Sequence, residues 1–311
     1  MPHIKALILR AAGINCDLEA QHAWELAGAQ AERVHVRRLI ERPQILAEYQ
    51  ILMIPGGFSY GDDIAAGRIL AAQLKRHLIE PIRDFVASGR LVLGVCNGFQ
   101  VLVNAGLLPF PDDGVPAGAA CERAAAFEAA STHRAYSISD HSAPADDLAR
   151  LSGLRTCTIS YNEPPGFQDR WVNLRATTRF CAFLDPGREY EMPIAHGEGR
   201  VLFADEQTLQ RVLSGGLNAL TYVAPPPHAG VTPGAPANPN GSVADIAGLC
   251  DPTGRILGLM PHPERFVHWT QHPCWTADRE RLADRCGAEG DGLALFRRAV
   301  AYLALSAGKN R

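Results

Sequence analysis

The chain has 311 residues, 47% of them hydrophobic, and a formal net charge of −3 at pH 7. This weakly acidic balance, with both signs of charge mixed along the chain, argues against nucleic acid or an anionic membrane as the main partner. No apolar run approaches the roughly 20 residues that a membrane span needs, and the N-terminus lacks the features of a signal peptide. Eight cysteines without regular spacing indicate reduced thiols, so we expect a cytoplasmic protein.

The first part of the chain alternates short apolar runs with helical patterns. The expected strands lie at 6–9, 34–36, 51–54 and 91–93, and the expected helices at 18–27, 64–75 and 82–87. Asp17 is the expected N-cap of the first helix. Such alternation predicts βαβ units and a parallel sheet covered by helices on both faces. The loops at 13–17, at 55–61 and around Cys96 should then meet at the sheet edge where ligands bind.

The pattern changes after residue 108. Residues 110–160 are rich in Ala, Asp, Ser and Pro with little periodicity, so we expect a surface insertion within one domain formed by residues 1–311. Residues 225–239 contain too many Pro and Gly residues for a regular element. The other expected elements are strands at 171–176, 181–184, 191–195, 200–204, 219–223, 246–250 and 256–260, and helices at 206–213 and 293–305.

The strongest chemical signal is the segment GVCNGFQ at 94–100, directly after an apolar run. A strand, Gly-x-Cys-x-Gly and a helix follow one another as in a nucleophile elbow, where small residues allow a sharp turn. Cys96 would lie above a helix N-terminus, where backbone N–H groups and the helix dipole favour a thiolate. A buried structural cysteine is the alternative, but packing alone does not require glycine on both sides. We predict that Cys96 is a nucleophile.

A second signal, MPHPE at 260–264, follows the strand expected at 256–260. Alternate residues of an extended segment project to the same side, so His262 and Glu264 can lie side by side. We expect His262 to be the base for Cys96 and Glu264 to orient the imidazole. Taken alone, the motif favours the interpretation that His262 is a packed turn residue and Glu264 a surface charge. The cysteine elbow makes the catalytic interpretation the preferred one.

A third signal is PGGFSYGD at 55–62, which follows another buried strand. Adjacent glycines let backbone N–H groups point into a site, and acyl transfer needs two such donors. We expect these to be the N–H groups of Gly57 and Asn97. Gly56, Phe58 and Gln100 are expected at the same substrate site. Taken alone, two glycines indicate only a tight turn.

Other combinations of polar residues are weaker. A metal site could be drawn from His268, His272, Cys274 and Cys286, but no complete ligand set is present and Pro273 interrupts any helix. We therefore expect no metal in this chain. Cys16 lies in a loop that should approach the active edge, yet it lacks flanking glycines. We interpret it as a small loop residue.

Five motifs together resemble the glutaminase subunits of phosphoribosylformylglycinamidine synthase, which are class I, or triad, glutamine amidotransferases. They are PGGFSYGD at 55–62, GVCNGFQ at 94–100, PIAHGEG at 193–199, NPNGS at 238–242 and MPHPER at 260–265. The cysteine and His-x-Glu motifs are typical of the class, and the others of this member. The long stretch at 110–160 and the residues after Asp62 depart from the usual pattern of the family.

The resemblance implies a flavodoxin-like, three-layer α/β/α fold with added antiparallel strands. It also implies hydrolysis of L-glutamine to L-glutamate and ammonia through a γ-glutamyl thioester on Cys96. His262 would protonate the departing ammonia and then activate water, while Glu264 orients it. The turn at His196 would lie at the glutamine pocket or the partner surface.

The resemblance further implies that ammonia passes to a separate synthetase subunit. That subunit would use ATP and Mg²⁺ to convert formylglycinamide ribonucleotide to formylglycinamidine ribonucleotide in purine biosynthesis. A small accessory subunit is a further expected partner, and no cofactor is expected in this chain. Two alternatives stay open: a non-catalytic scaffolding or regulatory subunit of the same complex, and an unrelated cysteine hydrolase on the same fold.

Overall fold

The computed structural model describes residues 4–62, 65–110, 156–225, 237–277, 280 and 289–309. A sheet of nine strands runs through the molecule. Its parallel half is formed by β2 (Gln30–His35), β1 (Lys5–Arg10), β3 (Ile51–Ile54), β4 (Leu91–Val95) and β11 (Ile256–Leu259), in that spatial order. Its antiparallel half continues with β10 (Ile246–Cys250), β9 (Leu220–Val223), β6 (Gln168–Ala176) and β7 (Glu189–His196). The fold is therefore the predicted parallel α/β sheet with added antiparallel strands.

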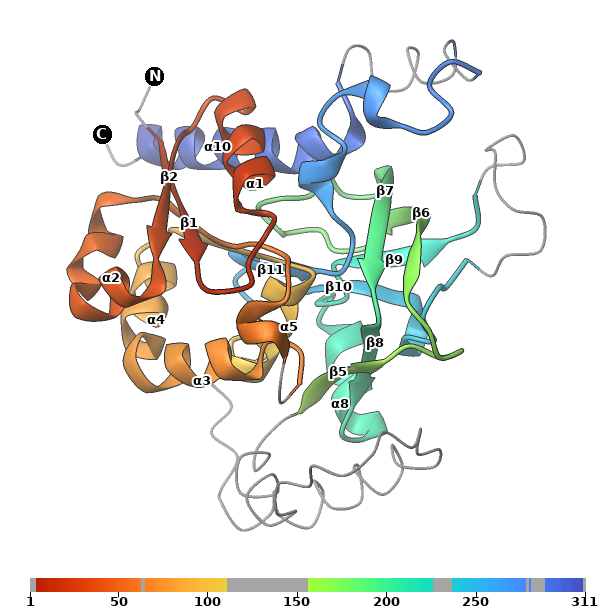
Figure 1. Ribbon diagram of the computed structural model, residues 1–311, viewed down its shortest axis with the longest axis horizontal. Coiled ribbons are helices and arrows are strands. Elements are labelled where there is room, and N and C mark those ends of the chain that lie inside the picture. Colours follow the sequence, from red (N-terminus) through yellow and green to blue (C-terminus); the bar gives the residue numbers. More distant parts are fainter. Residues whose placement is uncertain are drawn as a thin grey trace.

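Helices cover the parallel half on both faces, which gives three layers (Figure 1). On one face, α1 (Asp17–Leu26) and α10 (Asp291–Lys309) pack together through an edge-to-face contact of Trp24 and Phe296. The other helices in the described residues are α2 (Val36–Glu41), α3 (Arg68–His77), α4 (Ile79–Ala87), α5 (Asn97–Ala105) and α8 (Glu206–Ser214). Of these, α3 packs on α5 and α4, and α5 packs on β3, β4 and β11.

The remaining regular elements are short. A second sheet pairs β5 (Cys157–Tyr161) with β8 (Glu198–Phe203). Short 3₁₀ segments lie at η1 (Pro43–Glu48), η2 (Ser59–Asp62), η3 (Val243–Asp245), η4 (Pro263–Arg265) and η5 (Trp269–Gln271). Several of these turns belong to loops that follow strands, where the functional residues were predicted.

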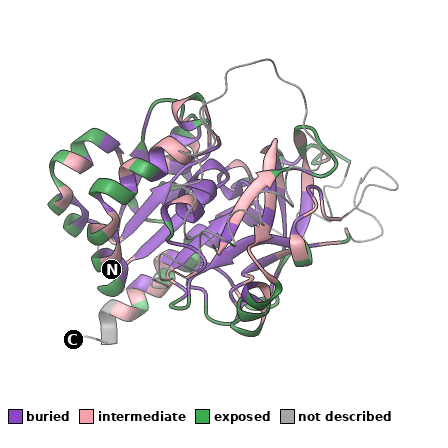
Figure 2. Cartoon of the chain, turned by 90° about the horizontal axis from the view of Figure 1, so that it is seen from below, coloured by how far each residue is buried: buried purple, intermediate pink, exposed green. Residues whose placement is uncertain are grey.

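The central strands are apolar because helices cover both of their faces. Every residue of β3, β4 and β11 is buried. Figure 2 shows buried strands, in purple, through the middle of the molecule. In a strand that is buried on both faces, polar and apolar residues do not alternate, so its sequence is a continuous run of aliphatic residues. These runs are the strands that the sequence predicts most directly.

Some predicted elements differ from the structure. Residues 181–184 form a turn rather than a strand, and the Ala182 N–H donates to the Gly254 carbonyl at 2.9 Å. Asp17 is the first residue of α1 rather than its N-cap, and its carboxylate pairs with Arg10 and Arg33. Helix α3 begins at Arg68, later than predicted, because the preceding glycine has a positive φ that an α-helix cannot contain.

Two predicted segments lie largely outside the described residues. Of the insertion predicted at 110–160, residues 111–155 are outside, and residues 157–160 belong to β5. Of the loop predicted at 225–239, residues 226–236 are outside. Within the described ranges, none of the helices combines the length and the apolar character needed to cross a membrane.

Candidate active site

Cys96 lies at a sharp turn between β4 and α5. Its backbone has φ 50° and ψ −107°, a conformation that a non-glycine residue rarely adopts, and it is 6% exposed. A β-carbon on Gly94 would lie 2.5 Å from Leu102 Cδ1 and 2.7 Å from the Gly98 carbonyl oxygen, and one on Gly98 would overlap the Ile54 carbonyl. The predicted elbow geometry is confirmed, since both glycines are needed for the turn.

His262 and Glu264 follow β11, the parallel neighbour of β4. Leu259 is in register with Val95, so the segment after β11 starts level with the elbow. The distance between His262 Nδ1 and Glu264 Oε1 is 2.7 Å, and both side chains are buried. The His262 N–H donates to the carbonyl of Pro193 at 2.9 Å, which attaches this segment to β7. The structure thus forms the predicted histidine–carboxylate pair at the elbow.

The surroundings of His262 favour its charged form. Burial disfavours a charge there, but the Glu264 carboxylate, followed by the nearby Cys96 and Cys16 thiols, raises the pKa of His262 well above its ordinary value. An imidazolium braced by a carboxylate is the partner that stabilises a neighbouring thiolate. The arrangement can therefore support nucleophilic catalysis by Cys96.

The loop at 55–62 lies across the elbow, as predicted for the strand-end loops. Gly57 forms an isolated bridge with Ile14, and the Phe58 N–H donates to the Gly13 carbonyl at 2.9 Å. The Ser59 N–H donates to Asn97 Oδ1 at 3.3 Å. Gly57 has φ 138°, which glycine tolerates, and a β-carbon there would lie 2.7–2.9 Å from backbone atoms of the β1–α1 loop.

The other predicted binding residues occupy different environments. Gly56 borders Cys96 and His262, because a β-carbon on it would lie 3.4 Å from Cys96 Cβ and 2.7 Å from His262 Cε1. Phe58 is 50% exposed at the rim. Gln100 is buried, and its amide donates to the Glu198 carbonyl at 2.7 Å. Gln100 therefore joins α5 to the β7–β8 turn.

That turn holds His196 beside the nucleophile. Cys96 Sγ is 3.8 Å from the Ala195 carbonyl oxygen. His196 is buried with Nδ1 3.1 Å from Asn162 Oδ1, and burial lowers the pKa of His196 to about 4, so the ring is neutral near pH 7. A side chain on Gly199 would overlap the His196 ring. The HGEG motif therefore builds a rigid wall of the site.

Sequence reasoning missed the residues that brace this wall. The Asn162 amide donates to the His196 carbonyl at 2.9 Å, and its Oδ1 accepts the Gly199 N–H at 3.0 Å. The Asn240 amide donates to the Gly199 carbonyl at 2.8 Å, and Ser242 Oγ accepts the Val201 N–H at 3.0 Å. The NPNGS motif was a visible signal, but its partner in space was not.

Cys16 lies in the loop between β1 and α1. It is 1% exposed, and Arg265 Nη2 lies 3.1 Å from its sulfur. Burial raises the pKa of the Cys16 thiol, and His262 is close enough to oppose that effect. Cys16 is thus a loop residue at the active edge, as predicted, and the structure adds that its side chain is buried beside Arg265. The signal available was its position in the loop after β1, at the same sheet edge.

The weaker histidine and cysteine group does not converge. His272 Nε2 is 3.2 Å from Glu191 Oε1, whereas His268 Nδ1 is 2.7 Å from Thr270 Oγ1. The Cys274 N–H donates to His272 Nδ1 at 3.1 Å, and residue 286 lies outside the described ranges. Each of these imidazoles is thus engaged with a different neighbour.

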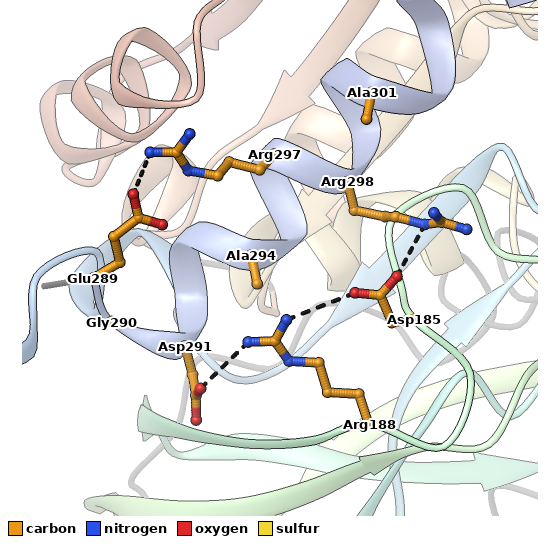
Figure 3. A pocket seen from close by; sticks show the side chains of 9 residues that line it. All are labelled: Asp185, Arg188, Glu289, Gly290, Asp291, Ala294, Arg297, Arg298 and Ala301. Atoms are coloured by element: carbon orange, nitrogen blue, oxygen red, sulfur yellow. Dashed lines mark hydrogen bonds and ion pairs between the residues drawn. The ribbon is translucent and has the colours of Figure 1, made fainter. Parts of the chain in front are cut away.

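A separate pocket lies beside the N-terminal part of α10 (Figure 3). Its charged lining residues are Asp185, Arg188, Glu289, Asp291, Arg297 and Arg298. Each arginine points toward a carboxylate, and dashed lines in the figure mark these pairs. The pocket contains none of the residues that meet at the elbow.

Comparison with known proteins decides between the classes of enzyme that this geometry allows. The family model of the CobB/CobQ-like glutamine amidotransferase domain matches residues 3–135 and 145–303. The chain belongs to this glutamine amidotransferase family. The amidotransferase is 38% identical over 304 residues to the phosphoribosylformylglycinamidine synthase subunit PurQ of Dehalococcoides mccartyi. The matched residues make up 97% of this chain and 98% of that protein.

Further relatives agree. Subunit PurQ of Treponema denticola is 37% identical to this amidotransferase over 266 residues, 85% of this chain and 88% of that protein. Among solved structures, PurLQS from Thermotoga maritima matches with a TM-score of 0.60 and 25% identity, over 97% of this chain and 99% of that one. These relatives place the amidotransferase among the glutaminase subunits of phosphoribosylformylglycinamidine synthase, as the sequence motifs predicted.

Proposed function

We propose that Cys96, His262 and Glu264 perform glutamine hydrolysis in this chain as nucleophile, acid–base catalyst and orienting carboxylate. The observation that supports these roles is the buried His262–Glu264 pair, 2.7 Å apart, beside a strained cysteine at a strand-to-helix turn. A histidine held through one ring nitrogen keeps the other directed at the reacting atoms.

The proposed reaction has two halves. The Cys96 thiolate attacks the side-chain amide carbon of L-glutamine, the C–N bond breaks, and His262 donates a proton to the departing nitrogen. Ammonia leaves and a γ-glutamyl thioester remains on the sulfur. Water then attacks the thioester while His262 takes its proton, and L-glutamate and the free cysteine result.

The tetrahedral intermediates need two hydrogen-bond donors for their oxyanion. The N–H groups of Gly57 and Asn97 take this role in the proposal. The bridge from Gly57 to Ile14 and the bond from Ser59 to Asn97 support it, because they hold the loop against the elbow. Gly56 leaves room for the substrate, and the exposed ring of Phe58 would cover it.

Gln100 and His196 act on the substrate indirectly in this proposal. The Gln100 amide already binds the Glu198 carbonyl, and His196 is held by Asn162, so both position the wall of the site. The neutral His196 ring adds no positive charge beside His262. We therefore assign both residues to the pocket as positioning groups.

We infer that the ammonia is used by a synthetase subunit that converts formylglycinamide ribonucleotide with ATP and Mg²⁺, in the cytoplasm. The named relatives and the PurLQS match support this assembly, including a small accessory subunit. ATP and Mg²⁺ would bind the synthetase. The glutaminase chain would contribute ammonia only.

The test compares two nitrogen sources in the reconstituted complex. Cys96→Ala should lower the glutamine-dependent rate by about 10⁴–10⁶-fold, because the nucleophile is lost. The ammonia-dependent rate should stay unchanged, since the synthetase is intact. Cys274→Ser is the matched control and should keep both rates. Glutamine-dependent synthesis that survives in Cys96→Ala would refute the assignment.

A labelling experiment separates this function from a scaffolding subunit. A glutamine-like electrophile should modify Cys96 stoichiometrically in the complex, and glutamine should protect it. A scaffold would have no reason to hold a thiol there that reacts with a glutamine analogue. Comparison of glutamine with other amides and esters tests the third reading, an unrelated cysteine hydrolase.

A further inference from the structure

Cys16 is a second thiol in the active site that glutamine hydrolysis does not use. It lies in the loop between β1 and α1, where its N–H donates to the Gly56 carbonyl at 3.4 Å. Arg265 Nη2, just beyond the catalytic motif, lies 3.1 Å from its sulfur. The thiol is therefore fixed by two of the loops that form the site, although the proposed reaction needs one cysteine only.

The space above Gly56 shows how closely the two cysteines and the histidine approach one another. A β-carbon added to Gly56 would lie 2.7 Å from His262 Cε1, 3.3 Å from Cys16 Sγ and 3.4 Å from Cys96 Cβ. All three side chains thus border one small space that glycine leaves open. In the described part of the chain, Cys16, His262 and Glu264 each offer a metal-ligand atom, and these atoms lie within 4.8 Å of one another. Cys96 Sγ is not one of the atoms of this group, so Cys96 can become a ligand only if its side chain turns toward Cys16 and His262.

The imidazole is oriented as in a zinc site. Glu264 Oε1 holds His262 Nδ1 at 2.7 Å, and His262 Nε2 is buried without a hydrogen-bond partner among the described residues. A histidine that binds zinc usually gives its other ring N–H to a carboxylate, a backbone carbonyl or water, and Glu264 can take this part here. Thiolate sulfur and imidazole nitrogen are also the donors that zinc prefers.

We propose that Cys16 Sγ, Cys96 Sγ and His262 Nε2 form a binding site for a thiophilic divalent cation such as Zn²⁺. Each thiol would release its proton to solvent on binding, and Glu264 would remain on Nδ1. Zinc bonds of about 2.3 Å to sulfur and 2.0–2.1 Å to nitrogen require the ligands to draw together by rotation of the short cysteine side chains. Water would take the fourth position.

Such a cation would inhibit catalysis, because it occupies the nucleophile and the base together. This consequence rests on the proposed function, whereas the binding itself does not. With Cys16 the metal would have three protein ligands, and without it only Cys96 and His262. The affinity for the metal should therefore depend on Cys16.

Cobalt spectroscopy tests the binding on the purified chain without any assay of activity. Titration with Co²⁺ should produce a thiolate-to-cobalt charge-transfer band and the visible bands of a tetrahedral site, at one ion per chain. Zn²⁺ should remove them. Cys16→Ser and Cys96→Ser should each weaken binding by at least about 10–100-fold, the loss seen even for outer-shell changes. Cys274→Ser should bind like the wild type.

A second measurement uses the unaltered chain, so it does not depend on the folding of a variant. Zn²⁺ should protect both Cys16 and Cys96 from an alkylating reagent, as mapped by mass spectrometry, whereas Cys274 should react equally with and without the metal. Protection of Cys96 alone, or the absence of a thiolate band, would overturn the proposal.

The inhibitory consequence is measured in the reconstituted complex. Each rate with Zn²⁺ is divided by the metal-free rate of the same variant, and a chelator should restore it. The zinc concentration for half inhibition should rise by at least about tenfold in Cys16→Ser. Equal sensitivity in both proteins would overturn the inhibitory role. A cobalt site in a chain without glutaminase activity would contradict the proposed function but not the metal site.

Discussion

Two charged clusters of this amidotransferase differ in how far their polar groups are satisfied by one another. In the pocket beside α10, Arg188 and Asp185 are 38% and 43% exposed and 3.6 Å apart, and Arg298 pairs with the same aspartate (Figure 3). At the elbow, the His262 and Glu264 side chains are 2% and 0% exposed. There, His262 Nε2 and Glu264 Oε2 have no hydrogen-bond partner among the described residues.

The difference in burial distinguishes surface ion pairs, which have little effect on the fold, from buried charged groups that take part in the proposed reaction. Exposed ion pairs contribute about 0–1 kcal/mol each, since water solvates the separated ions nearly as well. A buried polar atom without a hydrogen-bond partner lowers the stability of the fold by about 1–3 kcal/mol. Such atoms are found at functional sites, where a substrate or another ligand binds them. Substitutions in the two clusters should therefore affect different properties.

The largest expected effect is on catalysis at the elbow. Glu264→Gln keeps the shape of the side chain but removes the charge that opposes desolvation of His262, so the pKa of His262 should fall. The glutamine-dependent rate should decrease by about 10²–10⁴-fold, because the imidazolium loses its support. Steady-state kinetics on the complex would measure the rate, and the pH profile would show the ionisation of His262 moving to lower pH.

Glu289→Gln is the matched control in the other cluster. It removes a carboxylate that pairs with Arg297 in a pocket that no residue of the triad lines. Its rate and pH profile should match the wild type. A Glu264→Gln enzyme with an unchanged pH profile would show that the carboxylate does not act through the histidine.

The next effect concerns stability against pH in the wall of the site. Burial lowers the pKa of His196 to about 4, whereas an unfolded histidine titrates near 6.5. Between these values the unfolded chain binds more protons than the folded one, so stability falls as pH falls. The contribution of His196 is about 3 kcal/mol across this window. Because His262 has a raised pKa, its contribution changes above this window and with the opposite sign.

Denaturant unfolding of the wild type and of His196→Gln, from pH 7 to pH 4, would isolate this contribution. The variant should lose less stability on acidification, whatever its stability at pH 7. Parallel curves for the two proteins would show that His196 is not buried in its neutral form.

The strands and the elbow could be predicted because their causes are local in sequence. A strand covered on both faces is apolar at every position, as in β4, and the glycines around Cys96 satisfy a steric need two residues away. The same reasoning was wrong for residues 181–184, because an apolar turn buried against the Gly254 segment has the composition of a strand.

The loop position of Cys16 could be predicted, but its contact with Arg265 could not, because the two residues are distant in sequence. Its sulfur meets Arg265 from a segment 249 residues later, and the two become neighbours only when β1 and β11 occupy one sheet. The hydrogen bonds of Asn162 and Asn240 to the His196–Gly199 turn depend in the same way on how β5, β8 and the NPNGS segment pack. The sequence motifs indicated the type of reaction. The order of strands in the sheet determines which side chains become neighbours at the site.

The smallest expected effect lies in the cluster beside α10. Arg297 and Glu289 form an ion pair there with side chains 51% and 43% exposed. A double-mutant cycle with Arg297→Gln and Glu289→Gln should give a coupling of about 0.2–1 kcal/mol in the free energy of unfolding, and less at high salt. A coupling near 3 kcal/mol, typical of buried pairs, would remove the contrast between the clusters. It would mean that this pair is shielded from water and that exposure alone does not distinguish structural charge from the charge kept for catalysis.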